Sequence, residues 1–154
     1  GHQLLGEQFP GADGILEPGL ELLDVTTKRL PKRAVGELLA SPAGGGGPFL
    51  GQLTQPLTGY ENHAGGTSLG ASARPLAHVQ VGTGNGTRDA GGPASEGAVQ
   101  GRIVGTYLHG PGLARNPELA DLLLSWVVGS ALPAWENADI DALRAERLAA
   151  VKPR

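Results

Sequence analysis

The stretch Gly101-Arg-Ile-Val-Gly-Thr-Tyr-Leu-His-Gly-Pro-Gly-Leu-Ala-Arg-Asn-Pro-Glu-Leu-Ala-Asp121 joins a strand pattern to a helix start. β-Branched and aromatic residues between Ile103 and Tyr107 favour a strand, and the run Gly110-Pro111-Gly112 cannot continue one. His109 is therefore expected where a strand ends. In open α/β sheets, reactive groups collect just beyond the carboxyl ends of strands. A lone histidine is more often structural than catalytic, so its position alone does not assign His109 a role.

The residues after His109 have the pattern of an amphipathic helix. Asn116 and Pro117 resemble an N-cap followed by a first-turn proline, and Gly129 closes the pattern. Apolar residues recur at helical spacing between them, namely Leu119, Leu122, Leu123, Trp126 and Val127. A further helix is predicted to start near Asp139, within a tail of residues 137–154. This tail is expected to pack on the domain surface, with docking on a partner as the alternative.

Composition limits the classes of protein that the chain can belong to. Its 154 residues amount to one domain, and a formal net charge of −3 offers no basic field for nucleic acid. No apolar run is long enough for a membrane span and no signal peptide is recognised, so a cytoplasmic location is expected. The chain contains no cysteine and no methionine. We therefore expect no disulfide, and the missing initiator indicates a sequence cut from something longer.

Upstream of the quoted stretch, the pattern alternates between apolar runs and turn chemistry. The runs predict strands over Leu20–Thr27, Ala34–Ala40, Phe49–Leu57 and Leu76–Val81. Before the first run, Gly1–Gln8 predicts the first turns of a helix and Phe9–Gly19 a surface loop. Farther along, the sequence predicts a connection over Lys28–Arg33, a loop over Gly59–Thr67 and a tight turn at Gly84–Gly86.

Two of these segments carry side chains capable of chemistry. The basic cluster Lys28–Arg33 is either a solvated turn or the source of an arginine fork that grips a carboxylate. Glu61 and His63 stand two residues apart without a third ligand, so no metal site is predicted. The stretch Gly82–Thr87 fails the spacing of a dinucleotide-binding loop. No cofactor is expected.

Three segments in the same order resemble the cobyric-acid-synthase-type class I glutamine amidotransferases. They are Gly1-His-Gln-Leu-Leu-Gly6, Gly59-Tyr-Glu-Asn-His-Ala-Gly-Gly-Thr67 and Gly105-Thr-Tyr-Leu-His-Gly-Pro111. Within that family the chain is most similar to the GatD-type glutaminase subunits of lipid II isoglutaminyl synthase. The resemblance covers nearly the whole chain and implies an α/β, flavodoxin-like three-layer sandwich. Residues 1–154 would be the C-terminal portion of one such domain.

The resemblance also implies a site. Gly1, His2 and Gln3 match the end of the family's Cys-x-Gly-(Tyr/His)-Gln motif, so the nucleophilic cysteine would lie two residues before Gly1. His109 aligns with the catalytic histidine, and Arg33 stands at the spacing of a substrate-binding arginine. Gln3 and Gly1 would lie near the nucleophile, where backbone N–H groups can stabilise an oxyanion. Pro111 stands where other class I enzymes carry an acidic residue, so the orienting carboxylate would come from elsewhere in the chain or from a partner.

The implied activity is the hydrolysis of glutamine to glutamate and ammonia. The implied partner is the Mur-ligase-like protein MurT, which would use ATP and this ammonia to amidate D-glutamate of the peptidoglycan stem. Two alternatives remain. The chain could belong to a corrinoid-amidating enzyme, although cobyric acid synthases more often have an apolar residue where Asn62 stands. A chain that truly begins at Gly1 would instead be a catalytically inactive fragment.

Overall fold

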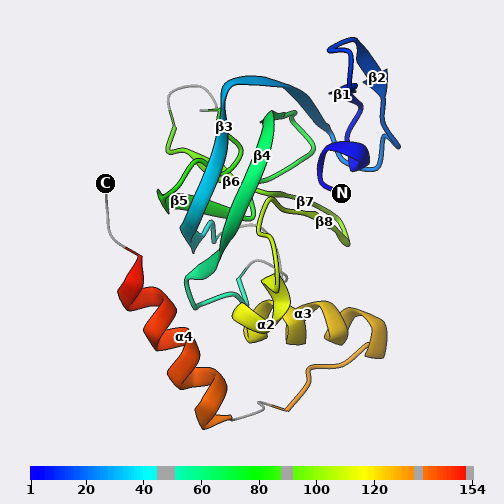
Figure 1. Ribbon diagram of the computed structural model, residues 1–154. Helices are drawn as coiled ribbons and strands as arrows, with labels where there is room; N and C mark the ends of the chain where they lie inside the picture. The colour runs from blue at the N-terminus through cyan, green and yellow to red at the C-terminus, as the bar shows by residue number, and fades with distance from the viewer. Residues whose placement is uncertain (45–50, 88–91, 134–136, 152–154) are drawn as a thin grey trace.

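Two long antiparallel strands, β3 (Val25–Pro42) and β4 (Leu57–Leu69), run through the centre of the structure (Figure 1). This computed structural model describes residues 1–44, 51–87, 92–133 and 137–151. β4 pairs along one edge of β3, and the other edge carries a parallel strand near its start and an antiparallel one near its end. The other strands are β1 (Gln8–Pro10), β2 (Leu16–Pro18), β5 (Ala77–Val81), β6 (Ser95–Glu96), and the separate pair β7 (Ala98–Gln100) and β8 (Ile103–Gly105).

A bulge interrupts β3 where the sequence predicts a connection between two strands. Arg29 pairs with Gly65 and Ala34 pairs with His63, so five steps along β3 face only two along β4. The extra residues leave the ladder without ending the strand, as they do in other bulges. The two predicted strands are therefore one element, and that element begins at Val25 rather than at Leu20.

β4 corrects a second prediction, because the glycine-containing segment 59–67 is strand and not loop. Its glycines mark places where other segments approach the sheet. A Cβ atom at Gly59 would lie 2.7 Å from Leu108 Cδ2, and one at Gly65 would overlap the side-chain nitrogen of Gln3. Glycine in a strand often has this meaning, since it lets a second backbone or side chain come close.

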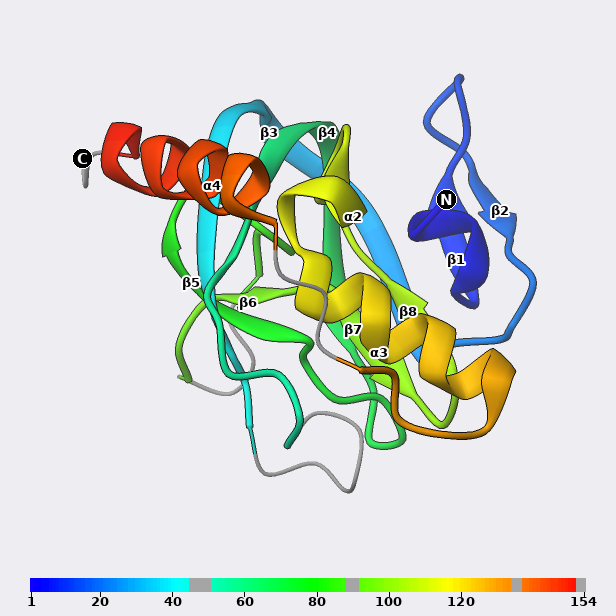
Figure 2. The ribbon, with the colours of Figure 1, turned by 90° about the horizontal axis from the view of Figure 1, so that it is seen from below.

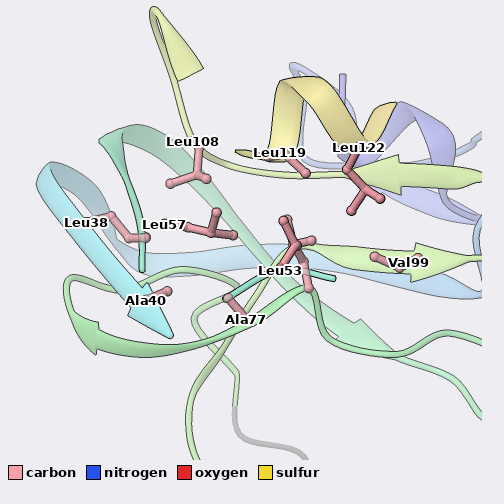
Figure 3. Packing of buried hydrophobic residues seen from close by; sticks show 10 residues of the cluster. Leu38, Ala40, Leu53, Leu57, Ala77, Val99, Leu108, Leu119 and Leu122 are labelled. Atoms are coloured by element: carbon pink, nitrogen blue, oxygen red, sulfur yellow. The ribbon is translucent and has the colours of Figure 1, made fainter. Parts of the chain in front are cut away.

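The hydrophobic core lies between this sheet and helix α3 (Pro117–Val128), which follows the short helix α2 (Gly112–Arg115). Figure 3 shows leucines of α3 directed toward the side chains of β3, β4 and β5. The buried cluster consists of Leu38, Ala40, Leu53, Leu57, Leu76, Ala77, Val99, Leu108, Leu119 and Leu122. Full burial of one large apolar side chain contributes about 1.5–3 kcal/mol, so this cluster is a major source of stability. Leu108 belongs to it, which ties the segment before His109 to the core.

α3 has the predicted ends, but the side chain of its N-cap residue makes different contacts from those of a helix cap. Gly129 closes the helix in the left-handed conformation, and Asn116 is the N-cap residue. The Asn116 side chain does not cap the helix. It accepts the backbone N–H of Thr58 at 2.8 Å and donates to the carbonyls of Thr58 and Gly112, which fastens the helix start to β4. Val127 is 85% exposed, so the buried face of α3 is narrower than the spacing predicts.

Helix α4 (Ala138–Ala150) begins at Asn137, whose side chain accepts the backbone N–H groups of Asp139 and Ile140. None of its described residues is fully buried. Arg144 holds it, because its guanidinium donates to the carbonyls of Arg115 and Pro56. Figure 2 shows α4 next to α2, on the opposite side of the molecule from the β1–β2 hairpin. The division of residues 1–154 into one domain with a tail at 137–154 stays a prediction.

The combination of a mixed sheet with packed helices confirms the predicted α/β class. β5 and the turn at Gly84–Gly86 agree with the sequence, whereas three other segments differ. Residues 51–56 precede the strand that begins at Leu57 rather than belonging to it, and Phe49 and Leu50 lie outside the described residues. The predicted loop over residues 9–19 contains the β1–β2 hairpin, and a 3₁₀ turn, η1 (Gln3–Leu5), replaces the predicted helical start. Within the described chain, no helix is long and apolar enough to cross a membrane.

We expect Asn116→Ala to destabilise the protein more than Asn137→Ala, although both residues precede a helix. The first substitution leaves the buried backbone groups of Thr58 without their partners, which costs about 1–3 kcal/mol for each buried group. The second removes an exposed cap worth about 1 kcal/mol. Urea unfolding of the two variants measures the difference. Equal losses would mean that the contacts of Asn116 with Thr58 contribute no more stability than an exposed helix cap.

Candidate active site

His109 is held by its backbone to β4 and by its ring to the preceding residue. β8 ends at Gly105, so His109 does not end that strand as the sequence predicts. It forms an isolated antiparallel bridge with Tyr60 and donates its N–H to the Tyr60 carbonyl at 2.8 Å. Its ring nitrogen Nδ1 lies 2.9 Å from the Tyr107 carbonyl. A carbonyl can only accept, so Nδ1 carries a proton in this contact, and Nε2 of the exposed ring is the nitrogen left to act as a base.

Arg33 lies at the end of the β3 bulge and reaches across to β4. Its Nε donates to the side-chain oxygen of Asn62 at 2.7 Å. A longer hydrogen bond runs from Arg33 Nη2 to the Asn62 carbonyl at 3.5 Å. The two contacts fix the plane of the guanidinium, and its remaining N–H groups are left for an additional acceptor. Arg33 makes no ion pair with any described residue. The arrangement suits the binding of a carboxylate, which takes two parallel hydrogen bonds from such a fork.

A pocket of about 320 Å³ brings together all four residues that the sequence nominates, Gly1, Gln3, Arg33 and His109. They come from the first residues of the chain, from the β3 bulge and from the segment after β8. The other lining residues are His2, Asn62, His63, Ala64, Thr106 and Tyr107. Among these described residues Arg33 is the one permanently charged side chain, and none is a carboxylate. The pocket therefore favours a ligand that carries negative charge.

Tyr107 is the centre of the pocket's inner wall. Its ring stacks on His63 with 3.7 Å between centroids, and it meets His2 edge-on at 4.9 Å. Its hydroxyl lies 2.7 Å from Thr67 Oγ1 and 3.3 Å from Gln3 Nε2. Burial raises the pKa of this hydroxyl, so it stays protonated at neutral pH. The Tyr107 hydroxyl thus positions Gln3 by a hydrogen bond, and the packed rings form one apolar side of the pocket.

The two buried histidines have contrasting environments. Neither ring nitrogen of His2 has a hydrogen-bond partner among the described residues, and burial lowers its pKa to about 4. His63 donates Nδ1–H to the Gly65 carbonyl at 2.8 Å, and its Nε2 lies 3.6 Å from a carboxylate oxygen of Glu61. These environments differ from that of His109, whose ring is exposed and whose second nitrogen faces no described acceptor.

Glu61 is used for structure within the sheet. Its carboxylate accepts the backbone N–H groups of Thr83 and Gly84 at 2.8 and 2.9 Å. Burial opposes its ionisation, but the nearby His63 ring and these N–H groups outweigh burial, so the pKa of Glu61 lies below its usual range. Among the described residues, no three potential metal ligands are grouped.

Sequence reasoning missed several residues of the site, for recognisable reasons. Asn62 and His63 stand in the segment interpreted as a loop, although they face Arg33 and Tyr107 across strands. Thr106 and Tyr107 were counted only as strand formers, yet both line the pocket. Their positions beside His109 in the quoted stretch were the available signal.

The chain matches one protein family and is similar to two kinds of protein within it. The sequence profile of the CobB/CobQ-like glutamine amidotransferase domain matches residues 1–117. The GatD subunit of lipid II isoglutaminyl synthase (glutamine-hydrolyzing) from Staphylococcus aureus (strain N315) is 34% identical over 124 residues, 80% of this chain and 45% of that protein. The same subunit from Streptococcus pneumoniae is 30% identical over 144 residues, 89% of this chain and 51% of that protein.

Cobyric acid synthases are similar to a comparable degree. The enzyme from Pelotomaculum thermopropionicum is 36% identical over 137 residues, 82% of this chain and 24% of that protein. The chain thus spans about half the length of the GatD proteins and about a quarter of this cobyric acid synthase. These matches agree with the fold class and the resemblance inferred from the sequence.

We expect His2 to make the folded protein less stable in mild acid. In the unfolded chain the His2 pKa is 6.5, and in the folded protein it is about 4. Between pH 6.5 and pH 4 the unfolded state therefore binds a proton on His2 that the folded state does not bind. The free energy of unfolding falls as the pH is lowered through this range. The loss is complete near pH 4 and amounts to about 3 kcal/mol.

Urea unfolding of the wild type and of His2→Phe at pH 7 and near pH 4 tests this expectation. The substitution keeps an aromatic ring against Tyr107 but removes the titrating group. The free energy of unfolding of the wild type should drop more steeply with acid than that of the variant. Parallel pH profiles would show that His2 protonates equally in both states.

Proposed function

Because the chain belongs to the CobB/CobQ-like glutamine amidotransferase family, we propose that it supplies the histidine and substrate-binding half of a glutaminase site. The observation that supports this most directly is the His109 ring. Its Nδ1 proton is engaged by the Tyr107 carbonyl, and its Nε2 is left as a base on a pocket that also contains Arg33. The nucleophile would be a cysteine two residues before Gly1, since the chain itself contains none.

The proposed reaction is the hydrolysis of the side-chain amide of glutamine. His109 Nε2 takes the thiol proton, and the thiolate attacks the amide carbon to form a tetrahedral intermediate. Backbone N–H groups near Gly1 and Gln3 stabilise the oxyanion. The protonated ring then gives its proton to the departing ammonia. Water, activated by the same nitrogen, releases glutamate from the thioester.

Arg33 would bind the α-carboxylate of glutamine in this reaction. Its guanidinium is oriented by Asn62, and no acidic residue among the described ones neutralises it. A substrate with one carboxylate and one amide fits a pocket with one fixed cation and one base at separate positions on its wall. Gln3 would complete the substrate contacts with its side-chain amide, whose nitrogen donates a hydrogen bond to the Tyr107 hydroxyl.

The ammonia would be used in peptidoglycan synthesis. We propose that the whole protein is the glutaminase subunit of lipid II isoglutaminyl synthase and acts in the cytoplasm with a MurT-like ligase. That partner would use ATP to amidate D-glutamate of the stem peptide, so the subunit would contribute to cell wall biogenesis and cell shape. The similarity to two GatD proteins supports this acceptor.

Corrinoid amidation is the second candidate, because a cobyric acid synthase is 36% identical to the chain. Asn62 favours the first candidate: its side chain holds Arg33 Nε, and an apolar residue there would leave that group unpaired. The acceptors separate the two proposals. The whole protein, assayed with its ligase partner, ATP and glutamine, should amidate lipid II and leave a corrinoid carboxylate unchanged. The reverse result would select the second candidate.

In the whole protein, we expect His109→Ala to lower kcat for ammonia release from glutamine by about 10²–10⁴-fold, because the general base is lost. The fold should persist, since the His109 side chain is exposed and its bridge to Tyr60 uses backbone atoms. A coupled glutamate assay measures the rate, and circular dichroism checks the fold. A folded variant with substantial activity would remove His109 from the mechanism.

Arg33→Ala is expected to raise KM for glutamine by about 10–100-fold, the equivalent of one lost charge-assisted contact, with little change in thermal stability. Arg33→Lys should restore only part of the affinity, because an ammonium cannot bond to Asn62 and a carboxylate with the same planar geometry. If both variants keep the wild-type KM, Arg33 is only a solvated residue of the bulge.

A further inference from the structure

Glu96 is a buried carboxylate to which the proposed reaction gives no role. It ends the two-residue strand β6, is fully buried, and does not line the pocket. Burial raises its pKa, and its Oε2 has no hydrogen-bond partner among the described residues. Burying an acidic side chain is unfavourable unless its contacts offset the loss of hydration. The compensating contacts of Glu96 are made by its other carboxylate oxygen, Oε1.

Those contacts start a chain of hydrogen bonds that ends on the His109 ring. Glu96 Oε1 accepts the Thr106 hydroxyl at 2.5 Å and the Tyr107 N–H at 2.8 Å. Since the Thr106 hydroxyl donates to Glu96, its oxygen is free to accept, and it takes the Leu108 N–H at 3.0 Å. The carbonyl on the other side of that peptide bond belongs to Tyr107. It accepts the Nδ1 proton of His109.

This chain fixes one peptide plane from both ends. In a trans peptide the N–H and the C=O point in opposite directions, so holding the Leu108 N–H also aims the Tyr107 carbonyl. The aimed carbonyl decides which ring nitrogen of His109 carries the proton. In many hydrolases a side-chain carboxylate contacts the histidine directly for this purpose. Here Glu96 does not touch His109, and a backbone carbonyl takes the contact.

We propose that Glu96 is a positioning residue for His109, acting through the Thr106 hydroxyl and the Tyr107–Leu108 peptide. The proposal rests on the role given above to His109. It requires only an acceptor oxygen at Oε1, since both of its partners are donors.

The test uses the whole protein and five substitutions, one of them a control. Glu96→Leu removes the acceptor, and Glu96→Gln keeps it. Thr106→Val removes the hydroxyl link at constant shape, and Thr106→Ser keeps it. Glu118→Leu is the matched control, because Glu118 also accepts a threonine hydroxyl and backbone N–H groups, from Thr54 and Gln55, but lies on α3 away from the pocket.

Two measurements separate positioning from plain structural support. The first is kcat and KM for glutamine. The second is the pair of ¹⁵N chemical shifts of the His109 ring at about pH 9, where histidine is neutral. We expect Glu96→Leu and Thr106→Val to lower kcat by about 10–100-fold through misplacement of the base, with KM within a factor of about two. In both variants the Nδ1–H signature should give way to a mixture of tautomers.

The conservative variants and the control should differ from these two. Glu96→Gln and Thr106→Ser should keep the wild-type ring signals and most of kcat, and Glu118→Leu should leave both unchanged. The proposal is overturned if Glu96→Leu keeps the wild-type ring signals, or if Glu118→Leu reproduces its effects. If Glu96→Leu does not fold, Thr106→Val against Thr106→Ser decides. If the wild type releases no ammonia, the proposed function fails, while the ring signals still test the positioning.

Discussion

The antiparallel ladder between β3 and β4 is the constraint on which the rest of the structure depends. Its bulge sends Arg33 out of register so that the guanidinium meets Asn62 on the neighbouring strand. The same β4 strand accepts the His109 backbone at Tyr60 and places His63 against Tyr107. Because β4 contacts Arg33, His109 and Tyr107, the relative positions of these three residues are set by backbone pairing rather than by flexible loops. Such rigidity suits a site that must hold a substrate and a base at fixed separation.

The environment gives three histidines of one pocket different properties. His2 is buried, its ring nitrogens have no hydrogen-bond partner among the described residues, and its lowered pKa of about 4 keeps the ring neutral at pH 7 in the folded state. His63 is stacked on Tyr107 and bonded to a carbonyl, so it contributes packing and the shape of the wall. His109 alone is exposed, with one nitrogen fixed and the other open. One type of side chain thus has three uses in the pocket: a buried wall, a stacked ring and a reactive group. Burial and hydrogen bonding decide which role each ring takes.

Local patterns in the sequence predicted the elements that local forces determine. The helix after Asn116 and strand β5 follow from capping, spacing and turn residues within a few positions. The bulge and β4 were misread because their cause lies elsewhere in the chain. Gly59 and Gly65 are small since Leu108 and Gln3 approach them, and no short window contains that information.

For the site, the resemblance of three segments nominated Gly1, Gln3, Arg33 and His109, and the fold gathers them into one pocket. Asn62 and Glu96 were missed as contributors because their partners lie across strands or a hairpin away.

The hydrogen bond from His109 to the Tyr107 carbonyl has a consequence for chemical labelling. An acylating reagent such as diethyl pyrocarbonate attacks the unprotonated nitrogen of an imidazole. Nδ1 of His109 carries its proton toward a carbonyl, so the ring offers a single nucleophilic atom on the pocket side. His2 and His63 are shielded by burial. Modification should therefore yield one regioisomer at one residue of the pocket, which makes the reagent a footprint for anything that occupies it.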